Sequence, residues 1–352
     1  MSLTALERSF VNSSNQPKVC IVTDAGKNIG FGHVQRCLAI SEAFSKLGIN
    51  PRIILDGDKN CESIFHADGI KLQSWHSEHN ELYEYLKKFN IIIVDSLQID
   101  KNFCQNISNL TNMPVFIDDF IRLDHRKGIV IDWTILAEDK FYTKKYPGVK
   151  YLLGSRYAAL RRGFWETPAI SVKRHIENFL VTFGGSDVAN LTPLVLSLLN
   201  EKYPDITARV IIGPGFSDRN IEKVKNLKKK NNILLFNPKP PEIVEAMLAS
   251  DIAISTGGQT IYELACLRIP TIGIMVVDNQ LDDLNGWSET GYLEFVGNHK
   301  DKDIFERIKK SISDLSPYIE RQARVAIAAK YIDGNGAIRL VTKLLELYEN
   351  SL

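Results

Sequence analysis

Short apolar runs rich in β-branched residues alternate with longer amphipathic stretches along most of this chain. The first part of the chain has four such runs, each bounded by polar residues or glycine, at residues 18–24, 51–57, 90–96 and 113–119. Five more follow at residues 175–185, 206–215, 231–238, 250–258 and 269–276. Strands that are buried on both faces and separated by helices form parallel sheets, so the pattern predicts an α/β fold built from βαβ units.

The amphipathic stretches between these runs predict helices. After the first run, the apolar residues Val34, Leu38, Ala39, Phe44 and Leu47 roughly follow a helical period, and Gly48 ends it. Residues 316–352 have strong helical propensity, and part of this stretch could pack against the first half of the chain.

The strand pattern restarts after Arg162 with its own glycine turn, which predicts two Rossmann-like domains. We place an N-terminal extension at 1–17, the first domain at 18–165, the second at 166–335 and a C-terminal helix at 336–352. The boundary is expected in the proline-containing stretch 164–173. Two such domains that face each other place a ligand at the carboxyl ends of both sheets, in the cleft between them.

Composition and charge exclude several classes of protein. With 44% hydrophobic and 24% charged residues and a formal net charge of +1, the 352-residue chain has no charge excess that favours nucleic acid or an anionic membrane. No apolar run approaches the roughly 20 residues that a membrane helix needs, and the first residues lack the pattern of a signal peptide. Five cysteines without a CxxC spacing argue against disulfides and zinc. We therefore expect a cytoplasmic enzyme without a metal or another cofactor.

The sequence GFGH at residues 30–33 lies in the turn before the first predicted helix. The glycine spacing does not match the GxGxxG fingerprint of dinucleotide sites. The start of a helix suits a phosphate or a developing oxyanion, and its dipole would favour a neutral His33 that can accept a proton. The alternative is that a backbone carbonyl satisfies His33 and that it has no chemical role.

Two glycine turns in the second half predict an anion site. The turn VTFGGSD at residues 181–187 allows close approach of the backbone to a ligand, although it could also be a plain tight turn. In STGGQTIYE at residues 255–263, a glycine pair precedes a helix that carries Glu263. This carboxylate could accept hydrogen bonds from a ribose diol while the helix start faces a diphosphate, or it could be a solvated helix residue.

Several residues that follow strands of the first half are further candidates. Asp95, Asp118 and Asp119 come at strand ends, where a carboxylate can orient a histidine, hold a sugar hydroxyl or cap a helix. Asp118 and Asp119 are adjacent and would point to opposite faces of a continuing strand, so they do not form a metal-binding pair. Arg156 and Tyr157 could line the cleft or fix the two domains together.

Taken in order, these motifs resemble one known family. The segments at residues 30–40, 91–100, 115–120, 152–164, 179–192 and 255–280 look like those of the UDP-sugar hydrolase of pseudaminic acid biosynthesis and of spore-coat polysaccharide proteins of the same type. Both are relatives of the MurG-like glycosyltransferases with the GT-B fold. The resemblance covers roughly residues 18–297.

The resemblance implies removal of UDP from a 2,4-diacetamido-2,4,6-trideoxyhexose, with water attacking the anomeric carbon and inverting it. It places His33 at the anomeric centre as the base, with Asp95 or Asp119 orienting it or a sugar hydroxyl. The second half would bind UDP, with Glu263 on the ribose. The full set of residues expected to bind the substrate is Gly30, Gly32, Arg36, Arg156, Tyr157, Gly184, Gly185, Ser186, Asp187, Gly257, Gly258, Gln259, Thr260, Glu263, Asn279 and Gln280.

One residue departs from the family pattern. Leu97 occupies a position where the family commonly has a tyrosine, and leucine cannot donate a hydrogen bond to water or to a leaving group. Two other functions therefore stay open: a GT-B glycosyltransferase that uses a sugar acceptor, and a protein that binds a nucleotide sugar without turning it over. The sequence determines neither the sugar nor the oligomeric state.

Overall fold

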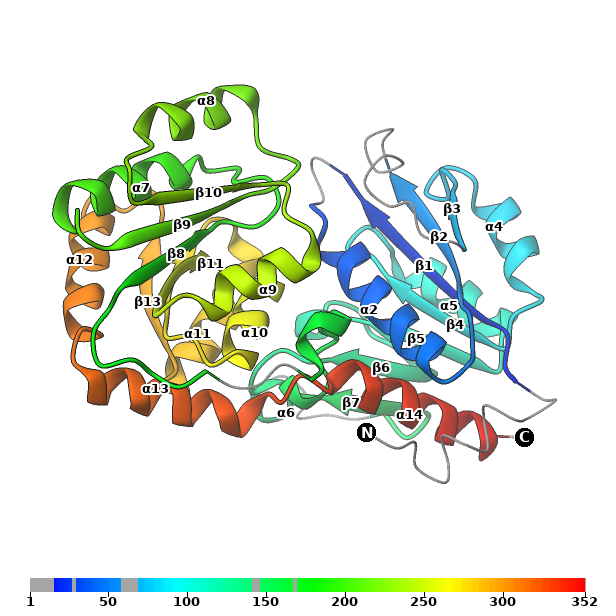
Figure 1. Ribbon diagram of the computed structural model, residues 1–352. Coiled ribbons are helices and arrows are strands. Elements are labelled where there is room, and N and C mark those ends of the chain that lie inside the picture. The colour runs from blue at the N-terminus through cyan, green and yellow to red at the C-terminus, as the bar shows by residue number, and fades with distance from the viewer. Residues whose placement is uncertain (1–15, 27–29, 58–68, 141–145, 167–169, 352) are drawn as a thin grey trace. The chain divides into compact units, whose positions relative to one another are not determined.

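The computed structural model describes residues 16–26, 30–57, 69–140, 146–166 and 170–351, and it divides the chain into two compact units (Figure 1). Unit 1 ends at Arg162 and takes up the chain again from Asn335, whereas unit 2 runs from Gly163 to Gly334. The sequence predicts the boundary after residue 165. The division comes earlier because Phe164 is buried in unit 2, where its carbonyl oxygen lies 3.7 Å from the thiol of Cys266.

Unit 1 contains a parallel sheet of seven strands in the order β3-β2-β1-β4-β5-β6-β7. Its strands are β1 Val19–Ala25, β2 Arg52–Gly57, β3 Ile70–Leu72, β4 Ile91–Asp95, β5 Met113–Ile117, β6 Gly128–Asp132 and β7 Val149–Leu153. The four strands predicted for this half are confirmed as β1, β2, β4 and β5. Strands β3, β6 and β7 were missed; β3 has only three residues, and the pattern of β7 is interrupted by an exposed lysine.

Helices cover both faces of this sheet. Its helices are α2 Gly32–Lys46, α4 His79–Leu86, α5 Lys101–Leu110, α6 Ala137–Lys140 and α14 Gly336–Glu349, with short 3-10 turns η1 Asp119–Ile121, η2 Ser155–Tyr157 and, at the boundary between the units, η3 Arg162–Phe164. Residues of α4 and α5 form one core cluster with Val22 and Val94, whereas Val34 of α2 packs with Ala25 and Leu55. Helix α14 packs against α2 and η2, so the end of the chain completes unit 1 (Figure 1).

Unit 2 contains a parallel sheet of six strands in the order β10-β9-β8-β11-β12-β13. Its strands are β8 Asn178–Thr182, β9 Thr207–Ile212, β10 Asn232–Phe236, β11 Ile252–Thr256, β12 Thr271–Met275 and β13 Leu293–Asn298. The five predicted strands are β8 to β12. Strand β13 was missed because most of its residues are only partly buried, so it lacks a continuous apolar run.

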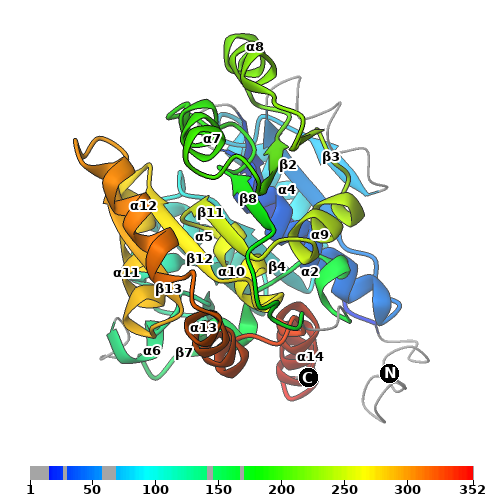
Figure 2. The same ribbon diagram turned by 60° about the vertical axis from the view of Figure 1, so that its left-hand side comes forward.

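The helices of unit 2 are α7 Leu191–Lys202, α8 Asp218–Leu227, α9 Pro240–Leu248, α10 Gln259–Cys266, α11 Leu281–Glu289, α12 Ile304–Asp314 and α13 Tyr318–Tyr331, with a 3-10 turn η4 Asp278–Gln280. Helix α7 packs on β8 and β9 and lies beside α8 (Figure 2). The predicted helical stretch at the end of the chain is confirmed but divided: α13 belongs to unit 2 and α14 to unit 1.

In both units the strand order reverses direction beside the first strand, between β1 and β4 and between β8 and β11. In open parallel sheets, ligands bind at the carboxyl ends of the strands at this switch point. No helix in the described part of the chain is both long and apolar enough to cross a membrane.

Candidate functional site

His33 and Asp95 form a buried pair at the carboxyl edge of the sheet of unit 1. His33 lies in the first turn of α2, the helix that follows β1 in the chain, and Asp95 is the last residue of β4. Because β1 and β4 are neighbours, with Thr23 opposite Asp95, the start of α2 comes next to the end of β4. Nδ1 of His33 lies 2.7 Å from Oδ1 of Asp95. A carboxylate therefore holds the ring, not the backbone carbonyl that was the alternative.

The proton on His33 can be placed from the surroundings of Asp95. Arg36 donates from Nη2 to Oδ1 and from Nε to Oδ2 of Asp95, both at 2.6 Å. Burial alone would raise the pKa of Asp95, but the charges of Arg36 and His33 hold that pKa well below its usual range. An ionised carboxylate only accepts hydrogen bonds, so Nδ1 of His33 carries the proton. In the neutral ring, Nε2 then has the free lone pair.

No described residue forms a hydrogen bond with Nε2 of His33. This nitrogen is therefore the one that can take a proton from a ligand or a water molecule. The turn before His33 is not tightly packed at Gly30 and Gly32: a Cβ atom added at either glycine would meet no described atom within 4 Å. The backbone of Gly30 pairs with Gly26, and its φ of 85° suits glycine.

Arg36 connects Asp95 to Asp119. Its Nη1 donates to Oδ2 of Asp119 at 2.7 Å, and its guanidinium lies 5.1 Å from the ring centre of Trp133. Arg36 is three residues after His33 and lies on the same face of α2, so the helix brings both side chains to Asp95. Arg36 is also predicted to bind the substrate, which stays a prediction. In the structure its guanidinium binds two carboxylates and positions the His33–Asp95 pair.

Asp118 and Asp119 have different surroundings because β5 ends at Ile117. Oδ2 of Asp118 accepts hydrogen bonds from the backbone N–H of Leu123 at 2.9 Å and from Nε2 of His125 at 3.0 Å. Asp118 therefore stabilises the turn after β5, and only Asp119 joins the arginine beside His33.

Arg156 and Tyr157 lie in η2 against α14. The guanidinium of Arg156 lies 5.1 Å from the ring centre of Tyr157, and the carbonyl oxygen of Arg156 accepts a hydrogen bond from Arg339 of α14. Tyr157 is buried. These contacts fix α14 to unit 1.

In unit 2, the GGSD turn follows β8 and leads to α7. Gly185 packs so tightly against Gly213 that a Cβ atom on Gly213 would lie 2.4 Å from the oxygen of Gly185. The carboxylate of Asp187 is buried and accepts hydrogen bonds from the backbone N–H groups of Leu191 and Thr192, at 2.8 and 2.9 Å. Asp187 thus stabilises the start of α7, which leaves Gly184, Gly185 and Ser186 as the part of the turn that could contact a ligand.

The second glycine turn of unit 2 leads into α10, and Gln280 supports it. Oε1 of Gln280 accepts hydrogen bonds from Oγ1 of Thr256 at 2.8 Å and from the backbone N–H of Val276 at 2.9 Å. A Cβ atom on Gly257 would lie 2.6 Å from Cβ of Gln280. Gln280 therefore supports the turn, and its contact with the substrate stays a prediction.

Further residues of this region were predicted to bind substrate. Glu263 lies on α10 and is only 5% exposed, so it is not a solvated surface residue. Gln259 and Thr260 are half-buried in the first turn of α10, and Asn279 is exposed in η4.

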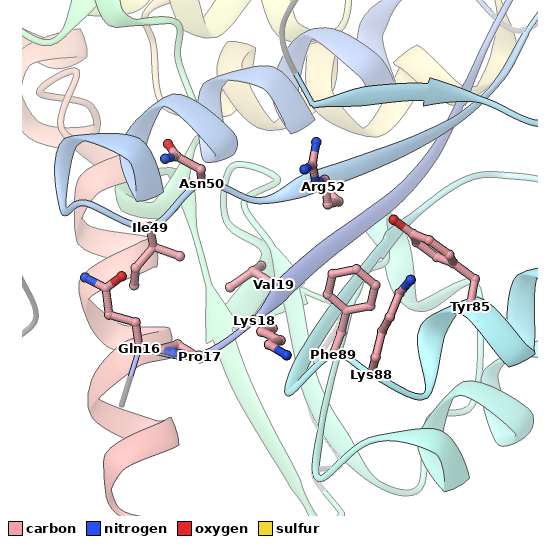
Figure 3. Close-up of a pocket in the computed structure, with 10 residues that line it drawn as sticks. All are labelled: Gln16, Pro17, Lys18, Val19, Ile49, Asn50, Arg52, Tyr85, Lys88 and Phe89. Atoms are coloured by element: carbon pink, nitrogen blue, oxygen red, sulfur yellow. The ribbon is translucent and has the colours of Figure 1, made fainter. Parts of the chain in front are cut away.

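A hollow of about 460 Å³ lies at the opposite edge of the sheet of unit 1, at the amino ends of β1 and β2 (Figure 3). Its lining includes Lys18, Arg52 and Lys88, and the ammonium group of Lys88 lies 3.7 Å from the ring centre of Tyr85. This hollow and the His33–Asp95 pair are at opposite ends of the strands, so the two are separate features.

Among the described residues, no group of three or more His, Cys, Asp or Glu side chains is arranged to hold a metal ion. Cys20, Cys37, Cys104 and Cys266 are free thiols, and Cys61 lies outside the described residues.

Comparison with solved structures decides the fold. The crystal structure of MurG from Acinetobacter baumannii superimposes with a TM-score of 0.64 at 12% sequence identity and covers 94% of this chain and 100% of MurG. The chain has the GT-B fold. The fold class predicted from the motifs is thereby confirmed as two Rossmann-like domains, which are units 1 and 2.

No protein-family model matches this GT-B chain, but curated relatives do. It is 24% identical to UDP-2,4-diacetamido-2,4,6-trideoxy-beta-L-altropyranose hydrolase of Campylobacter jejuni, over 78% of this chain and 97% of that protein. It is 22% identical to the spore coat polysaccharide biosynthesis protein SpsG of Bacillus subtilis, over 95% of this chain and 99% of that protein. The uncharacterized protein MJ1062 of Methanocaldococcus jannaschii is 27% identical over 72% of this chain, which spans 55% of the length of MJ1062. The resemblance derived from the motifs is confirmed.

Besides the His33–Asp95 and His125–Asp118 contacts, unit 1 contains the pair His76–Asp24, which sequence reasoning missed. Nε2 of His76 lies 3.1 Å from Oδ2 of Asp24, which is the sixth residue of β1. Asp24 ends an apolar run, as Asp95 does, and that position could have singled it out. His76 lies in a loop without a periodic pattern, so nothing in the sequence connects it to Asp24.

Proposed function

We propose that this protein is a UDP-sugar hydrolase that releases UDP from a UDP-2,4-diacetamido-2,4,6-trideoxyhexose. Water attacks the anomeric carbon, and the configuration at that carbon inverts. The observation that carries the proposal is the His33–Asp95 pair, in which Asp95 holds Nδ1 of His33 and Nε2 of His33 has no hydrogen-bond partner among the described residues. The name of the Campylobacter jejuni relative supports the substrate class, and that of the Bacillus subtilis relative supports a role in the synthesis of a surface polysaccharide. A relative in Helicobacter pylori, whose name joins the same hydrolase to a pseudaminic acid cytidylyltransferase, supports a role in nonulosonic acid synthesis as the alternative.

In the proposed reaction, Nε2 of His33 takes a proton from water while the water oxygen bonds to the anomeric carbon. The bond from that carbon to the β-phosphate oxygen breaks, and its electron pair stays on UDP. Asp95 stabilises the imidazolium that forms, as a carboxylate does for a histidine base, and Arg36 keeps the carboxylate ionised and in place. General base catalysis of this kind is typically worth about 10²–10⁴ in rate.

We assign UDP to unit 2. The turn of Gly184 and Gly185 and the start of α10 present backbone N–H groups that suit a diphosphate, and these groups need no reorganisation as charge develops on it. Glu263, buried on α10, would accept hydrogen bonds from the ribose diol. Gln280 would contribute to UDP binding by holding the glycine turn before α10 in place.

Leu97 favours a second candidate, a GT-B glycosyltransferase. Its side chain is 43% exposed directly after Asp95 and Ser96, and its carbonyl oxygen accepts a hydrogen bond from Nη1 of Arg122 at 3.0 Å. An exposed apolar side chain in a loop held this way could contact the ring of an acceptor sugar. His33 would then take the proton from an acceptor hydroxyl instead of from water.

Incubation of the pure protein with UDP-sugars, without any acceptor, distinguishes the two. For the hydrolase, we expect UDP to be released at catalytic rates. The first NMR spectra should show a free sugar whose anomeric configuration is inverted relative to the donor. Release that begins only when an acceptor glycan is added would overturn hydrolysis in favour of transfer. If the protein binds UDP but turns over no donor, with or without an acceptor, it is a nucleotide-sugar-binding protein and not an enzyme.

A further inference from the structure

The His76–Asp24 pair of unit 1 is built around a fully buried carboxylate, that of Asp24. Oδ2 of Asp24 accepts a hydrogen bond from Oγ of Ser96 and lies 3.1 Å from Nε2 of His76. The backbone N–H of Gln98 donates to Oγ of Ser96 at 2.9 Å, so the hydroxyl proton of Ser96 is directed to Asp24. Oδ2 of Asp24 is therefore an acceptor, and Nε2 of His76 carries the proton that faces it.

The free nitrogen of His76 is then Nδ1. The imidazole is 25% exposed, and no described residue forms a hydrogen bond with Nδ1. The ring contacts that of buried Trp75 in a tilted arrangement, with ring centres 3.7 Å apart and an angle of 33° between the ring planes. The backbone N–H of His76 donates a hydrogen bond to Asp56. The contacts with Asp24 and Trp75 hold the ring, and the bond to Asp56 holds the backbone of His76, while Nδ1 has no hydrogen-bond partner among the described residues.

A second observation also points to a ligand at this place. Oδ1 of Asp24 is buried and has no hydrogen-bond partner among the described residues. A buried carboxylate oxygen without a partner is costly, and such groups are retained where they serve a ligand or an ordered water molecule.

The His33–Asp95 and His76–Asp24 pairs lie at the same edge of the sheet, on opposite faces. Asp24 is two residues after Val22 in β1, so both lie on the same face of the sheet. This is the face that packs against α4 and α5, where Trp75 is also buried. Asp95 lies on the face of α2, where it meets His33. Strands β1 and β4 are neighbours, and Asp24 is one residue beyond the partner of Asp95, so both carboxylates lie at the switch point.

We propose that His76 is a ligand-binding residue of this protein, held by Asp24 and Ser96, and that its Nδ1 accepts a hydrogen bond from a hydroxyl or an amide N–H of the sugar. This inference rests on the proposed function, because it concerns the sugar of the same UDP-sugar. It adds a contact on the face of the sheet opposite to His33, so that the sugar is held from both sides of the edge.

Two substitutions of His76 separate ligand binding from a structural role. The amide of His76→Asn reaches the position of Nδ1, and the amide of His76→Gln reaches that of Nε2. If Nδ1 binds the sugar, kcat/KM for UDP release falls about tenfold or more in H76Q, mainly through KM, and falls less in H76N. If His76 only satisfies Asp24, the order reverses, because only H76Q keeps that contact. His79→Gln, at an exposed histidine three residues later, is the matched control and should match the wild type.

The inference is overturned if H76Q turns over substrate as H79Q does, or better than H76N. A wild-type protein that releases no UDP from any donor would instead be a failure of the proposed function. If thermal melting shows that either His76 variant is unfolded, a second measurement tests the contact. His33→Asn protein is titrated with the UDP-sugar, and its imidazole ¹⁵N spectrum is recorded. A change in the Nδ1 signal of His76 supports the contact, and an unchanged signal at saturation overturns it.

Discussion

Nδ1 of His33 and Oδ1 of Asp95 lie 2.7 Å apart, although 62 positions separate these residues in the chain. The contact determines which ring nitrogen is left for chemistry. Because Asp95 also accepts two hydrogen bonds from Arg36, the carboxylate stays ionised and the histidine is fixed with Nε2 free.

Replacement of His33 by asparagine should slow turnover strongly while the fold remains. The amide of His33→Asn can keep the hydrogen bond to Asp95 but offers no base at the position of Nε2. We expect the rate of UDP release to fall by about 10²–10⁴. The midpoint of thermal unfolding and the Kd for UDP, measured by calorimetry, should stay close to those of the wild type. Retention of the wild-type rate in H33N would exclude His33 as the base.

Replacement of Arg36 by methionine should destabilise unit 1. Arg36→Met leaves the buried carboxylate of Asp95 without its cation, and removal of one partner of a buried ion pair costs about 3–5 kcal/mol. Urea denaturation gives the free energy of unfolding. The same substitution at exposed Arg219 is the control and should change it by no more than about 0.5 kcal/mol. A small loss in R36M would mean that the Arg36–Asp95 contact does not hold the pair in place.

Asp95 should make unfolding more favourable in acid. Its pKa in the folded protein lies well below its usual range, whereas in the unfolded chain it is about 3.9. The stabilisation by the ionised carboxylate is therefore complete above about pH 4 and is lost as the pH falls from there toward the folded pKa. In Asp95→Asn, the free energy of unfolding should depend less on pH between about 4 and 2.

The control for this measurement is Asp205→Asn, at an exposed carboxylate in unit 2. Its pH profile of unfolding should follow that of the wild type. An equal acid slope in the wild type and in D95N would contradict a depressed pKa at Asp95.

Replacement of Glu263 by glutamine should remove the preference of the protein for UDP over 2′-deoxy-UDP. If Glu263 binds the diol, the wild-type protein binds UDP about tenfold more tightly than 2′-deoxy-UDP, because one charged hydrogen bond is lost with the hydroxyl. Glu263→Gln should bind both nucleotides with similar, weaker affinity, and exposed Glu245→Gln should behave as the wild type does. Equal preference for UDP in E263Q and the wild type would place the ribose elsewhere.

Replacement of Asp187 by alanine should affect stability more than ligand binding. Asp187→Ala removes the acceptor of the first N–H groups of α7, which costs about 1–2 kcal/mol. It also removes the acceptor for Nδ2 of Asn220, 3.0 Å from Oδ2 of Asp187. Urea denaturation and the Kd for UDP, measured on the same protein, separate the two effects. A large loss of UDP affinity with unchanged stability would show that Asp187 contacts the ligand directly.

The sequence alone predicts both halves of the fold because buried parallel strands are continuous apolar runs. This local property identifies β1, β2, β4, β5 and the first five strands of unit 2. It is lost in β3, which has three residues, and in β13, most of whose residues are only partly buried. The position of a polar residue after a strand is equally local, which is why His33, Asp95 and Glu263 could be singled out.

Only the tertiary structure decided what each of these residues contacts. Asp118 and Asp119 are adjacent, yet one supports a turn and the other binds Arg36, because β5 ends one residue before Asp118. The pairing of His33 with Asp95, and of His76 with Asp24, depends on strand order, register and side-chain direction. A hydrogen bond between residues far apart in the chain forms only when the packing of the whole sheet fixes both partners, and no short stretch of sequence contains that information.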